Sequence, residues 1–388
     1  MTRHSNLTIL FPTGSFYPAQ TGGPDNSVYW LTKALMRHDV KVLVATTERG
    51  LPASVPRKQW SEYDFAHIIY TKNRIHYLPF NLVLSAFKKL KSADILHLTM
   101  IYYPVSFLMA MLNQVFYKKP MVWSIRGDFD PHMMRRSTWK KRPIVFLIKR
   151  WLKKKVIFHS TCDAETQYAR ANLGEDIQVV QLTNYMEIPD KIDAKKEKYL
   201  LYLGRIDSKK AIENLITALD QSKSFRTSGF RLKIVGDHDN PYGSQLIDLV
   251  GQLNLDMLVE FVGHASGMEK QRILAAAYFL IMPSHTENFG IVVAEALAQG
   301  TPAVASIHTP WQILEKKQAG FWVDNQVNNL AACLDQILQL SPEEYKELQS
   351  NTRPLVVEEF DIQVNIAKWI QAYQSFEGVH NKKYEYRF

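Results

Sequence analysis

The sequence predicts an α/β protein built from two doubly wound parallel-sheet domains. Short apolar strands alternate with amphipathic helical segments, a pattern typical of a parallel sheet covered by helices on both faces. The 388 residues are more than one typical hydrophobic core holds. The alternation stops at a polar, lysine-rich connection from Asn184 to Lys198 and then starts again. We therefore expect a first domain over residues 1–185, a second over 186–355, and a helical tail over 356–388.

Apolar spacing predicts each element in turn. In the first domain, strands are expected at residues 7–11, 40–45, 67–70, 94–98, 121–125, 156–159 and 179–182. Helices are expected at 26–37, 82–91, 105–117, 144–154 and 164–172. In the second domain, strands are expected at 199–203, 232–235, 259–262, 278–282, 302–306 and 321–323. Helices are expected at 211–219, 245–253, 268–277, from 289 or 290 to 298, and after 327. The tail is expected to be helical over 356–375, with one apolar face.

Composition limits the class of protein. Apolar content of 46% and charged content of 22% are ordinary for a soluble globular chain. Cys162 and Cys333 lie far apart and form neither a disulfide nor a metal-binding pattern, which favours a reducing compartment. The apolar run at residues 7–12 is too short for a signal peptide, and the longest apolar stretch, 101–117, contains Pro104 and is shorter than the ~20 residues of a membrane span. We expect a soluble or peripheral protein.

The net charge of +9 comes mainly from one segment. Residues 131–155 carry ten Lys or Arg and no acidic residue, and aromatic residues such as Trp139 and Trp151 lie among them. A basic amphipathic helix with aromatics is typical of association with an anionic membrane surface, here through residues 133–155. A solvated face of the first domain above an ordinary buried stripe explains the same pattern equally well. Nucleic-acid binding ranks last, because no helix-turn-helix, zinc or RNA-recognition signature accompanies the charge.

The stretch from Pro283 to Ser306 carries the strongest candidate site. It is predicted to contain a strand end, a polar loop with Glu287, a helix with Glu295, and a further strand. Unpaired N–H groups and the helix dipole make the start of such a helix a site for a phosphate. A carboxylate further along the helix suits ribose hydroxyls, because it can accept two hydrogen bonds. Spacing alone nevertheless favours an ordinary βαβ unit with two solvated glutamates.

Two other loops follow predicted strands at the edge of a sheet where ligands bind. After the strand at 199–203, Gly204 and Arg205 are followed by Lys210, and two cations near a helix start can clamp a diphosphate. Charges on a solvated loop are the alternative. After the first strand, Gly22 and Gly23 precede Asp25, without the spacing of a dinucleotide-binding fingerprint. A loop that only needs positive backbone dihedrals explains these glycines equally well.

Taken together, these motifs resemble those of the retaining family 4 glycosyltransferases of the GT-B fold. Gly204, Arg205 and Lys210 match G-R-[IL]-x-x-x-K. The second motif, E-x-x-G-x-x-x-x-E-A-x-A-x-G-x-P, is matched by Glu287, Gly290, Glu295, Ala296, Gly300 and Pro302. Gly22 and Gly23 match the glycine loop of the family's first domain. The resemblance covers nearly the whole chain, and it implies two Rossmann-like domains facing a cleft, with the tail packed back on the first.

The resemblance also implies residue roles. Arg205 and Lys210 would neutralise the diphosphate of a nucleotide-sugar donor, so that neither a metal nor another cofactor is needed. Glu295 would hold the ribose, and Glu287 would lie near the reacting carbon of the donor sugar as a positioning and electrostatic group. The remaining donor-binding positions implied are Asn288, Phe289, Gly290, Ile291 and His264, besides the glycines above. The reaction implied is glycosyl transfer with retained anomeric configuration.

The chain departs from the family at the end of the strand near Ile125. Arg126 and Gly127 stand where His-Gly is frequent, which resembles a subgroup common among enzymes that build bacterial surface polysaccharide or lipopolysaccharide. Candidates on the acceptor side are Asp25, His97, Arg126 and Asp128, although His97 is about as well explained as a buried core histidine. Ala211 follows Lys210 where glycine is usual, and we expect it to be tolerated.

The function expected is therefore sugar transfer to a saccharide or lipid-linked acceptor, in the cytoplasm or on the inner face of the plasma membrane. A nucleotide-sugar epimerase or a phosphorylase of the same fold is the enzymatic alternative. A membrane- or nucleic-acid-binding module that kept the fold is the non-enzymatic one, and the presence of Arg205, Lys210, Glu287 and Glu295 argues against it.

Overall fold

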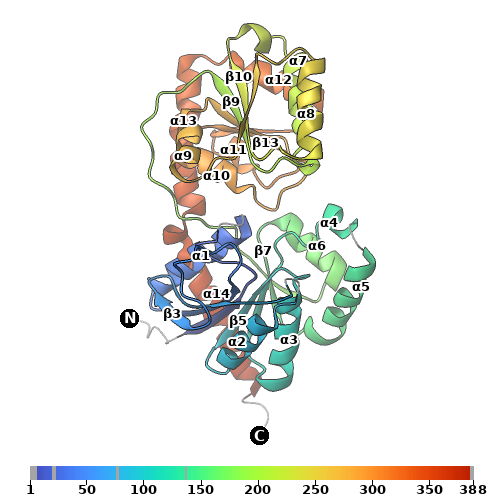
Figure 1. The fold of residues 1–388 in the computed structure, drawn as a ribbon, viewed down its shortest axis with the longest axis vertical. Helices are drawn as coiled ribbons and strands as arrows, with labels where there is room; N and C mark the ends of the chain where they lie inside the picture. The colour runs from blue at the N-terminus through green and yellow to red at the C-terminus, as the bar shows by residue number, and fades with distance from the viewer. Residues whose placement is uncertain (1–6, 20–22, 76–77, 136–137, 385–388) are drawn as a thin grey trace. The chain divides into compact units, whose positions relative to one another are not determined.

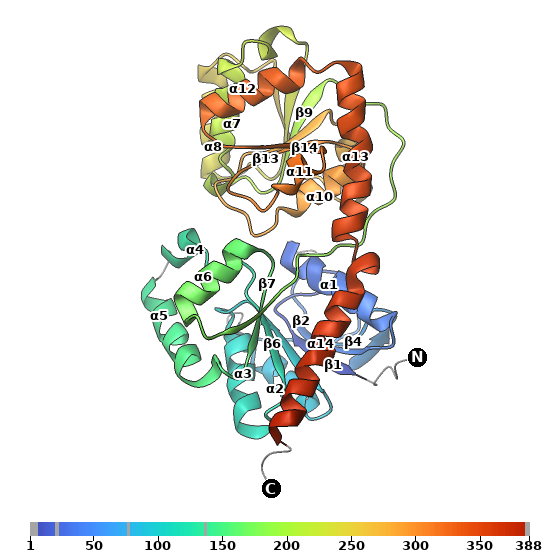
Figure 2. The same ribbon diagram turned by 180° about the vertical axis from the view of Figure 1, so that it is seen from behind.

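The computed structural model describes residues 7–19, 23–75, 78–135 and 138–384 (Figures 1 and 2). It consists of two compact units, Met1–Glu187 with Ile362–Phe388, and Ile188–Asp361. Each unit is a β-sheet covered by helices on both faces, parallel throughout in the second unit and parallel except for one edge strand in the first, so the prediction of two doubly wound α/β domains is confirmed. Among the described residues, no helix is long and apolar enough to cross a membrane.

The first unit contains an eight-stranded sheet in the order β3-β4-β2-β1-β5-β6-β7-β8. Its strands are β1 (Thr8–Pro12), β2 (Lys41–Thr47), β3 (Trp60–Tyr63), β4 (Ala66–Thr71), β5 (Ile95–Thr99), β6 (Met121–Ser124), β7 (Ile157–Ser160) and β8 (Gln178–Gln181). Its helices are α1 (Gly23–Met36), α2 (Phe80–Leu90), α3 (Pro104–Phe116), α4 (Pro131–Arg135), α5 (Thr138–Leu147), α6 (Asp163–Leu173) and α14 (Ile362–Tyr384), and a π-helical turn at Ile148–Leu152 follows α5.

The long C-terminal helix α14 completes the core of the first unit. Its apolar face carries Ile366, Trp369 and Tyr373, which are buried in one cluster with residues of β1, β2 and α1. Figure 2 shows α14 lying across the sheet beside α1. The helix preceding it, α13 (Pro342–Phe360), belongs to the second unit, so the expected continuous tail over 356–388 is in fact divided at Asp361.

The second unit contains a six-stranded parallel sheet in the order β11-β10-β9-β12-β13-β14. Its strands are β9 (Tyr199–Leu203), β10 (Arg231–Val235), β11 (Val259–Gly263), β12 (Phe279–Met282), β13 (Ala303–Ser306) and β14 (Gly320–Val323). Its helices are α7 (Ile212–Gln221), α8 (Pro241–Gln252), α9 (Gly267–Ala276), α10 (Ile291–Ala298), α11 (Ile313–Lys316), α12 (Val327–Leu338) and α13, with short 3₁₀ turns at Ser208–Lys210 and Phe225–Thr227. Counted from β9, the strand order is 3-2-1-4-5-6, the order of dinucleotide-binding folds.

Most predicted elements are confirmed to within a few residues, and two differences have local causes. The strand β3 was not predicted; it pairs antiparallel with β4 at the edge of the sheet, where Trp60 faces Ile69. The predicted helix at 144–154 is instead the end of α5 followed by the π-helical turn. Pro143 lies inside α5, where it removes one backbone donor from the helix.

Candidate functional site

The candidate site lies where the strand order of the second sheet reverses. β9 pairs with β12, and the chain leaves each strand at its carboxyl end into a polar loop. Ligands of open α/β sheets bind at such a switch point, because the connections on either side run in opposite directions. The loop after β9 carries Gly204, Arg205 and Lys210, and the loop after β12 carries Glu287. A backbone hydrogen bond from His285 N to Lys209 O, 2.9 Å long, joins the two loops.

Close backbone packing fixes the first of these loops. The Cα of Gly236, after β10, approaches the carbonyl of Gly204, and a Cβ added at Gly236 would lie 2.1 Å from that oxygen. The Tyr202 hydroxyl donates to the carbonyl of Arg205 over 2.7 Å. Asp207 caps the 3₁₀ turn at Ser208–Lys210, and Ala211, where glycine is usual, adopts a left-handed conformation with φ 50°. The turn therefore holds Lys210 at the start of α7.

Lys210 and Glu287 meet in this structure although 76 residues separate them in the chain. The Lys210 ammonium donates to Oε1 of Glu287, and Ser284 Oγ donates to the same oxygen over 2.9 Å. The two side chains are 16% and 14% exposed, so the ion pair is mostly, but not fully, screened from water. Both partners were predicted as site residues from the sequence, and the fold brings them together.

The second carboxylate, Glu295, lies on α10 and is also paired. Lys270, from α9, donates to Oε1 of Glu295 over 2.6 Å, and the carboxylate is 9% exposed. A carboxylate has a second oxygen with which to accept hydrogen bonds. Glu295 is thus a nearly buried acceptor whose negative charge is balanced by a neighbouring cation.

The start of α10 is built around Gly290. This residue has φ 76° and ψ 60°, a left-handed conformation that L-residues disfavour. A Cβ added there would lie 2.7 Å from Sδ of Met282. Phe289, just before it, is buried against Trp311, whose indole N–H donates to the carbonyl of Phe289. The backbone from Asn288 to Ile291 is therefore held in the shape that exposes the first N–H groups of the helix.

Other predicted donor-binding residues stand apart from this arrangement. Arg205 is 82% exposed, and its closest carboxylate oxygen, on Asp207, is 3.9 Å away. His264 follows β11 directly and is exposed. Gly23 begins α1 in the first unit, and Gly22 lies outside the described residues.

In the first unit, the Arg126–Gly127 pair forms an unusual turn after β6. Arg126 has φ 58° and Gly127 has φ 80°, so two successive residues are left-handed, a conformation that is costly for arginine. The buried carboxylate of Glu165 accepts from the Gly127 N–H and from Thr161 N, which fixes the turn. Arg126 donates to Asn184 Oδ1, while its Nε is buried without a hydrogen-bond partner among the described residues.

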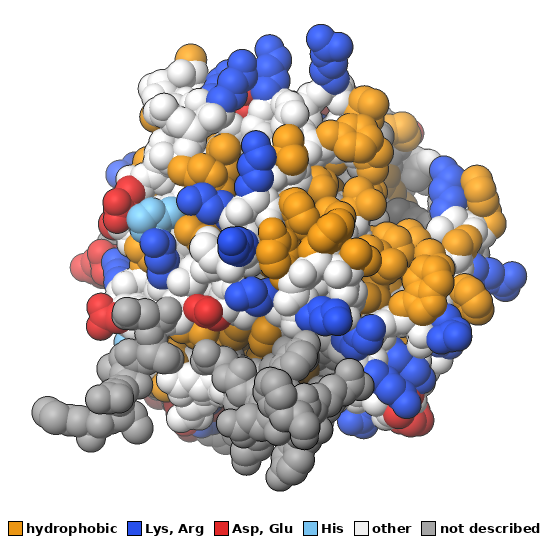
Figure 3. Space-filling model, turned by 90° about the horizontal axis from the view of Figure 1, so that it is seen from below, with side chains coloured by type: hydrophobic (Ala, Val, Ile, Leu, Met, Phe, Trp, Pro, Cys, Tyr) orange, Lys and Arg blue, Asp and Glu red, His pale blue; other side chains and the backbone are white. Residues whose placement is uncertain are grey.

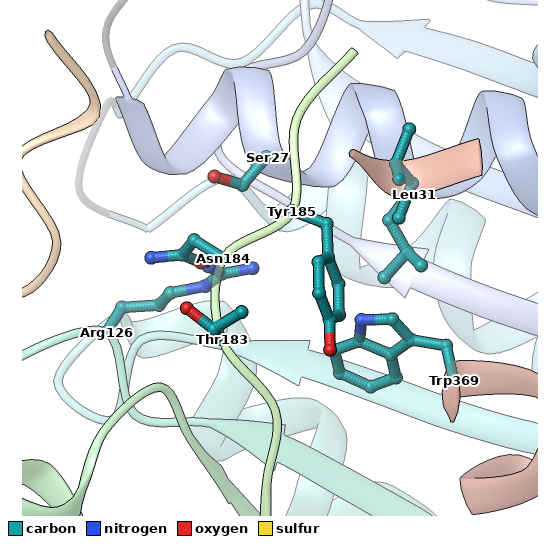
Figure 4. Close-up of a pocket in the computed structure, with 8 residues that line it drawn as sticks. Ser27, Leu31, Arg126, Thr183, Asn184, Tyr185 and Trp369 are labelled. Carbon is teal, nitrogen blue, oxygen red and sulfur yellow. Dashed lines mark hydrogen bonds between the residues drawn. The ribbon is translucent and has the colours of Figure 1, made fainter. Parts of the chain in front are cut away.

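Figure 4 shows where this arginine lies. Its side chain runs beneath Asn184 and borders a small pocket that is also lined by Ser27 of α1, Thr183, Tyr185 and Trp369 of α14. A buried guanidinium with an unpaired donor favours an anionic or strongly polar group as its ligand.

The other acceptor-side candidates are held in structural interactions. His97 is 1% exposed, and its ring nitrogens lie 2.6 Å from the Tyr373 hydroxyl and 2.7 Å from Ser124 Oγ. Burial keeps its pKa well below the usual range, and keeps the pKa of neighbouring His159 at about 3. Of the two interpretations of His97, the structure favours the buried core histidine, since neither ring nitrogen remains for a ligand.

Asp128 and Asp25 are likewise engaged. Asp128 is buried and accepts from the backbone N–H groups of Ile101 and Tyr102, and burial raises its pKa to about 7. Asp25 accepts from Ser15 Oγ over 2.5 Å at the start of α1. Asp128 thus ties the loop after β5 to the loop after β6.

Sequence reasoning missed several residues that support the site. Lys270 and Ser284 hold the two carboxylates, and Asn325 donates to the carbonyl of Pro283 over 2.8 Å, which anchors the loop of Glu287. Gly236 could have been suspected as a glycine directly after a strand, but no local pattern marks the other three. Their roles follow from contacts between distant segments.

The second unit matches a known family. Residues 185–354 match the family described as "Glycosyl transferases group 1". The chain is 33% identical over 144 residues to an uncharacterized glycosyltransferase of Methanocaldococcus jannaschii, covering 37% of this chain and 36% of that protein. It is 29% identical over 211 residues to glycogen synthase of Mycobacterium tuberculosis, covering 49% and 47%. The chain thus spans less than half the length of both curated relatives.

Solved structures are similar over almost the whole chain. Sucrose-phosphate synthase from Thermosynechococcus elongatus has a TM-score of 0.77 at 20% identity, covering 96% of this chain and all of that one. Anabaena HepE, solved in complex with UDP-glucose, has a TM-score of 0.72 at 17% identity, covering 95% and 99%. The chain therefore has the GT-B fold.

Proposed function

We propose that this protein is a glycosyltransferase that takes a sugar from a nucleotide-diphosphate sugar. The observation that carries the proposal is the contact between Lys210 and Glu287 at the switch point of the second sheet, beside the start of α10. A cation, a carboxylate and a helix start within one site suit a diphosphate joined to a polar sugar. The match to group 1 glycosyltransferases and the UDP-glucose complex of HepE support this donor class.

Each donor group then has a partner of suitable chemistry. The diphosphate is held by Lys210, by the N–H groups at Phe289–Ile291, and by Arg205, whose exposed side chain is free to turn toward the ligand. Glu295 accepts hydrogen bonds from the ribose while Lys270 balances its charge. His264, at the end of β11, is the candidate contact for the base.

The chemistry proposed is transfer with retained anomeric configuration. The bond between the anomeric carbon and the diphosphate oxygen breaks, and a bond from that carbon to an acceptor hydroxyl oxygen forms on the same face of the sugar. The hydroxyl proton passes to the departing diphosphate oxygen. Negative charge grows on the leaving diphosphate, and the cations of Arg205 and Lys210 stabilise it in place of a metal ion. Glu287 lies close enough to Lys210 to position the donor sugar and to favour positive charge at the reacting carbon.

The acceptor is proposed to be a saccharide or a lipid-linked saccharide, handled by the first unit in the cytoplasm at the inner face of the plasma membrane. The partly unpaired guanidinium of Arg126 is the candidate acceptor contact, with the neighbouring Asp25 and Asp128 shaping the loops around it. An Arg-Gly pair at this position supports a role in bacterial surface polysaccharide assembly.

A thermal-shift panel of UDP-, GDP- and ADP-sugars tests the donor class. A ligand at 100 times its Kd stabilises the folded protein by ~2.7 kcal/mol, which is easily detected. We expect one nucleotide to stabilise the wild type and to stabilise Lys210→Met much less. If no nucleotide shifts the melting temperature, or if all shift both proteins equally, the donor site is wrong. Proton NMR of the product formed from the stabilising donor then tests retention at the anomeric carbon.

A further inference from the structure

The first unit contains a long stretch of chain with almost no negative charge. Between Phe65 and Cys162 there are 18 Lys or Arg and three acidic residues, Asp94, Asp128 and Asp130. Each of these acids is engaged within the first unit. Asp94 accepts a hydrogen bond from Thr8 N, Asp128 is buried, and Asp130 accepts a hydrogen bond from Met133 N at the start of α4. The cations of this stretch therefore greatly outnumber the carboxylates that could neutralise them.

Helix α2, in this stretch, exposes an apolar and basic face. Phe80 and Leu84 are 60% and 52% exposed, and Lys88 and Lys91 continue the same row at helical spacing. The opposite face of α2, with Leu82 and Ala86, is buried in the core. The exposed apolar residues are thus additional to those that the fold needs.

Helix α3 extends this surface. Val115 and Phe116, at its C-terminal end, are 65% and 62% exposed, and Lys118 follows them. The rings of Phe87 and Phe116 are 5.3 Å apart, so the ends of α2 and α3 share one aromatic cluster. Figure 3, which views the structure from below, shows hydrophobic side chains gathered on this face, with Lys and Arg among and around them.

The segment at 131–155 adds aromatic residues of the same kind. Trp139, Phe146 and Trp151 are 74%, 65% and 50% exposed, whereas Ile148 and Leu152 fill the buried stripe. The core of this segment is therefore supplied by aliphatic residues, and its aromatic residues lie outward among lysines. The segment therefore has both a buried aliphatic stripe and an exposed aromatic face.

We propose that the exposed faces of α2, α3 and α5 form a docking surface for an anionic lipid bilayer. Aromatic and aliphatic side chains enter the interface between headgroups and acyl chains, and surrounding lysines attract anionic headgroups. A second copy of the chain is a poorer occupant, because pairing two such surfaces would bring like charges together. The surface extends well beyond residues 133–155, and the strongest apolar contribution outside that segment comes from α2 and α3.

Co-sedimentation with vesicles tests this surface directly. We expect the full-length protein to bind vesicles of phosphatidylcholine with phosphatidylglycerol, to bind phosphatidylcholine alone at least about tenfold more weakly, and to lose binding as salt screens the lysines. The paired variant Phe80→Ser with Phe116→Ser and the paired variant Lys88→Glu with Lys118→Glu should each reduce binding at least about tenfold. All four side chains are exposed, so folding should be preserved.

A matched control changes the same chemistry in the second unit. Met257→Ser with Lys346→Glu alters an 81% exposed apolar side chain and an exposed lysine there, and should leave vesicle binding unchanged. Nucleotide-induced thermal stabilisation should be the same in every variant, which separates membrane docking from the donor site. Equal binding to neutral and anionic vesicles, or no effect of the α2–α3 variants, would overturn the proposal. So would a dimer in solution that Phe80→Ser with Phe116→Ser converts into monomers, because a second copy would then cover the patch.

Discussion

Separating the two partners of the Lys210–Glu287 ion pair gives the sharpest test of the donor site. Lys210→Met keeps the length of the side chain and removes its charge, and Glu287→Gln keeps the shape of the carboxylate and removes its charge. If this were only a structural salt bridge, both variants would destabilise the protein and neither would affect nucleotide binding specifically. If Lys210 binds a diphosphate, Lys210→Met should weaken nucleotide binding and Glu287→Gln should not.

The magnitudes follow from the geometry. The pair is 16% and 14% exposed, so removing either partner leaves a largely desolvated charge and should cost about 1–3 kcal/mol of unfolding free energy. Losing a charge-assisted contact to a phosphate weakens binding by about 1.5–3 kcal/mol, or roughly 10- to 150-fold in Kd. Glu287→Gln instead removes a negative charge close to the diphosphate. At ~6 Å and an effective dielectric constant of ~20, that repulsion reaches at most about 3 kcal/mol, so Kd should stay equal or become tighter.

Isothermal titration calorimetry with the free nucleoside diphosphate measures these affinities without requiring an acceptor. Thermal unfolding of the ligand-free variants measures the stability cost, which we expect to be similar for both. Sugar transfer should be lost in both, because Lys210 stabilises the leaving group and Glu287 the reacting carbon. Equal weakening of nucleotide binding in the two variants would refute the assignment of Lys210 to the diphosphate. Transfer at the wild-type rate in Glu287→Gln would remove Glu287 from the reacting centre.

Three further predictions concern single residues. Glu295→Gln should reduce the preference for a ribonucleoside diphosphate over its 2′-deoxy analogue. The ribose would lose a charged acceptor that contributes about 1.5–3 kcal/mol to the binding free energy. An unchanged ratio of the two Kd values in calorimetry would contradict the ribose role. Asp128 has a pKa of about 7 in the folded protein, above its ordinary value, so the folded state binds the extra proton and the associated stability is lost as pH rises. Relative to Asp128→Asn, the free energy of unfolding of the wild type should fall by about 2–3 kcal/mol between about pH 5 and pH 8. If the melting temperatures of the two proteins change with pH in parallel, this carboxyl does not titrate in that range. Gly290→Ala should lower the free energy of unfolding by about 2 kcal/mol or more, because of the left-handed backbone and the contact with Met282. The control Gly251→Ala, within α8, should leave stability unchanged or raise it. The melting temperature of each variant measures both effects.

The elements of the fold were predictable because their hydrophobic patterns are local. Strands such as β9 and β12 are continuous apolar runs, as expected for parallel strands buried on both faces, and their ends are marked by glycine or proline. The break at Asp361 was not predictable in this way. The apolar residues before and after it follow one helical period, and only the packing of α14 on the first unit separates them.

The site residues that belong to the sequence motifs were predictable from the sequence. The residues that form hydrogen bonds or ion pairs with them were not. Glu287 and Glu295 were identified in the sequence only when their spacing was combined with the motif of Gly204, Arg205 and Lys210, because the spacing alone favours two solvated glutamates. Lys270 lies 25 residues before Glu295 in an ordinary amphipathic helix, and nothing local distinguishes it from a solvated lysine. The exposure of Phe80 and Phe116 is likewise a property of the folded surface, because both occur in segments whose periodicity fits buried helices.

The two site carboxylates share a feature that bears on how a donor would bind. In the structure, Glu287 is paired with Lys210 and Glu295 with Lys270, so neither acid leaves an uncompensated charge in a partly buried place. A neutral ligand cannot compete for these lysines, whereas a diphosphate carries enough negative charge to take Lys210 from Glu287. Glu287 would then lack its ion pair with Lys210 and would lie beside the sugar end of the ligand. Binding of the diphosphate would thereby raise the negative potential at Glu287 only when a donor is present, which is when positive charge at the anomeric carbon needs stabilisation.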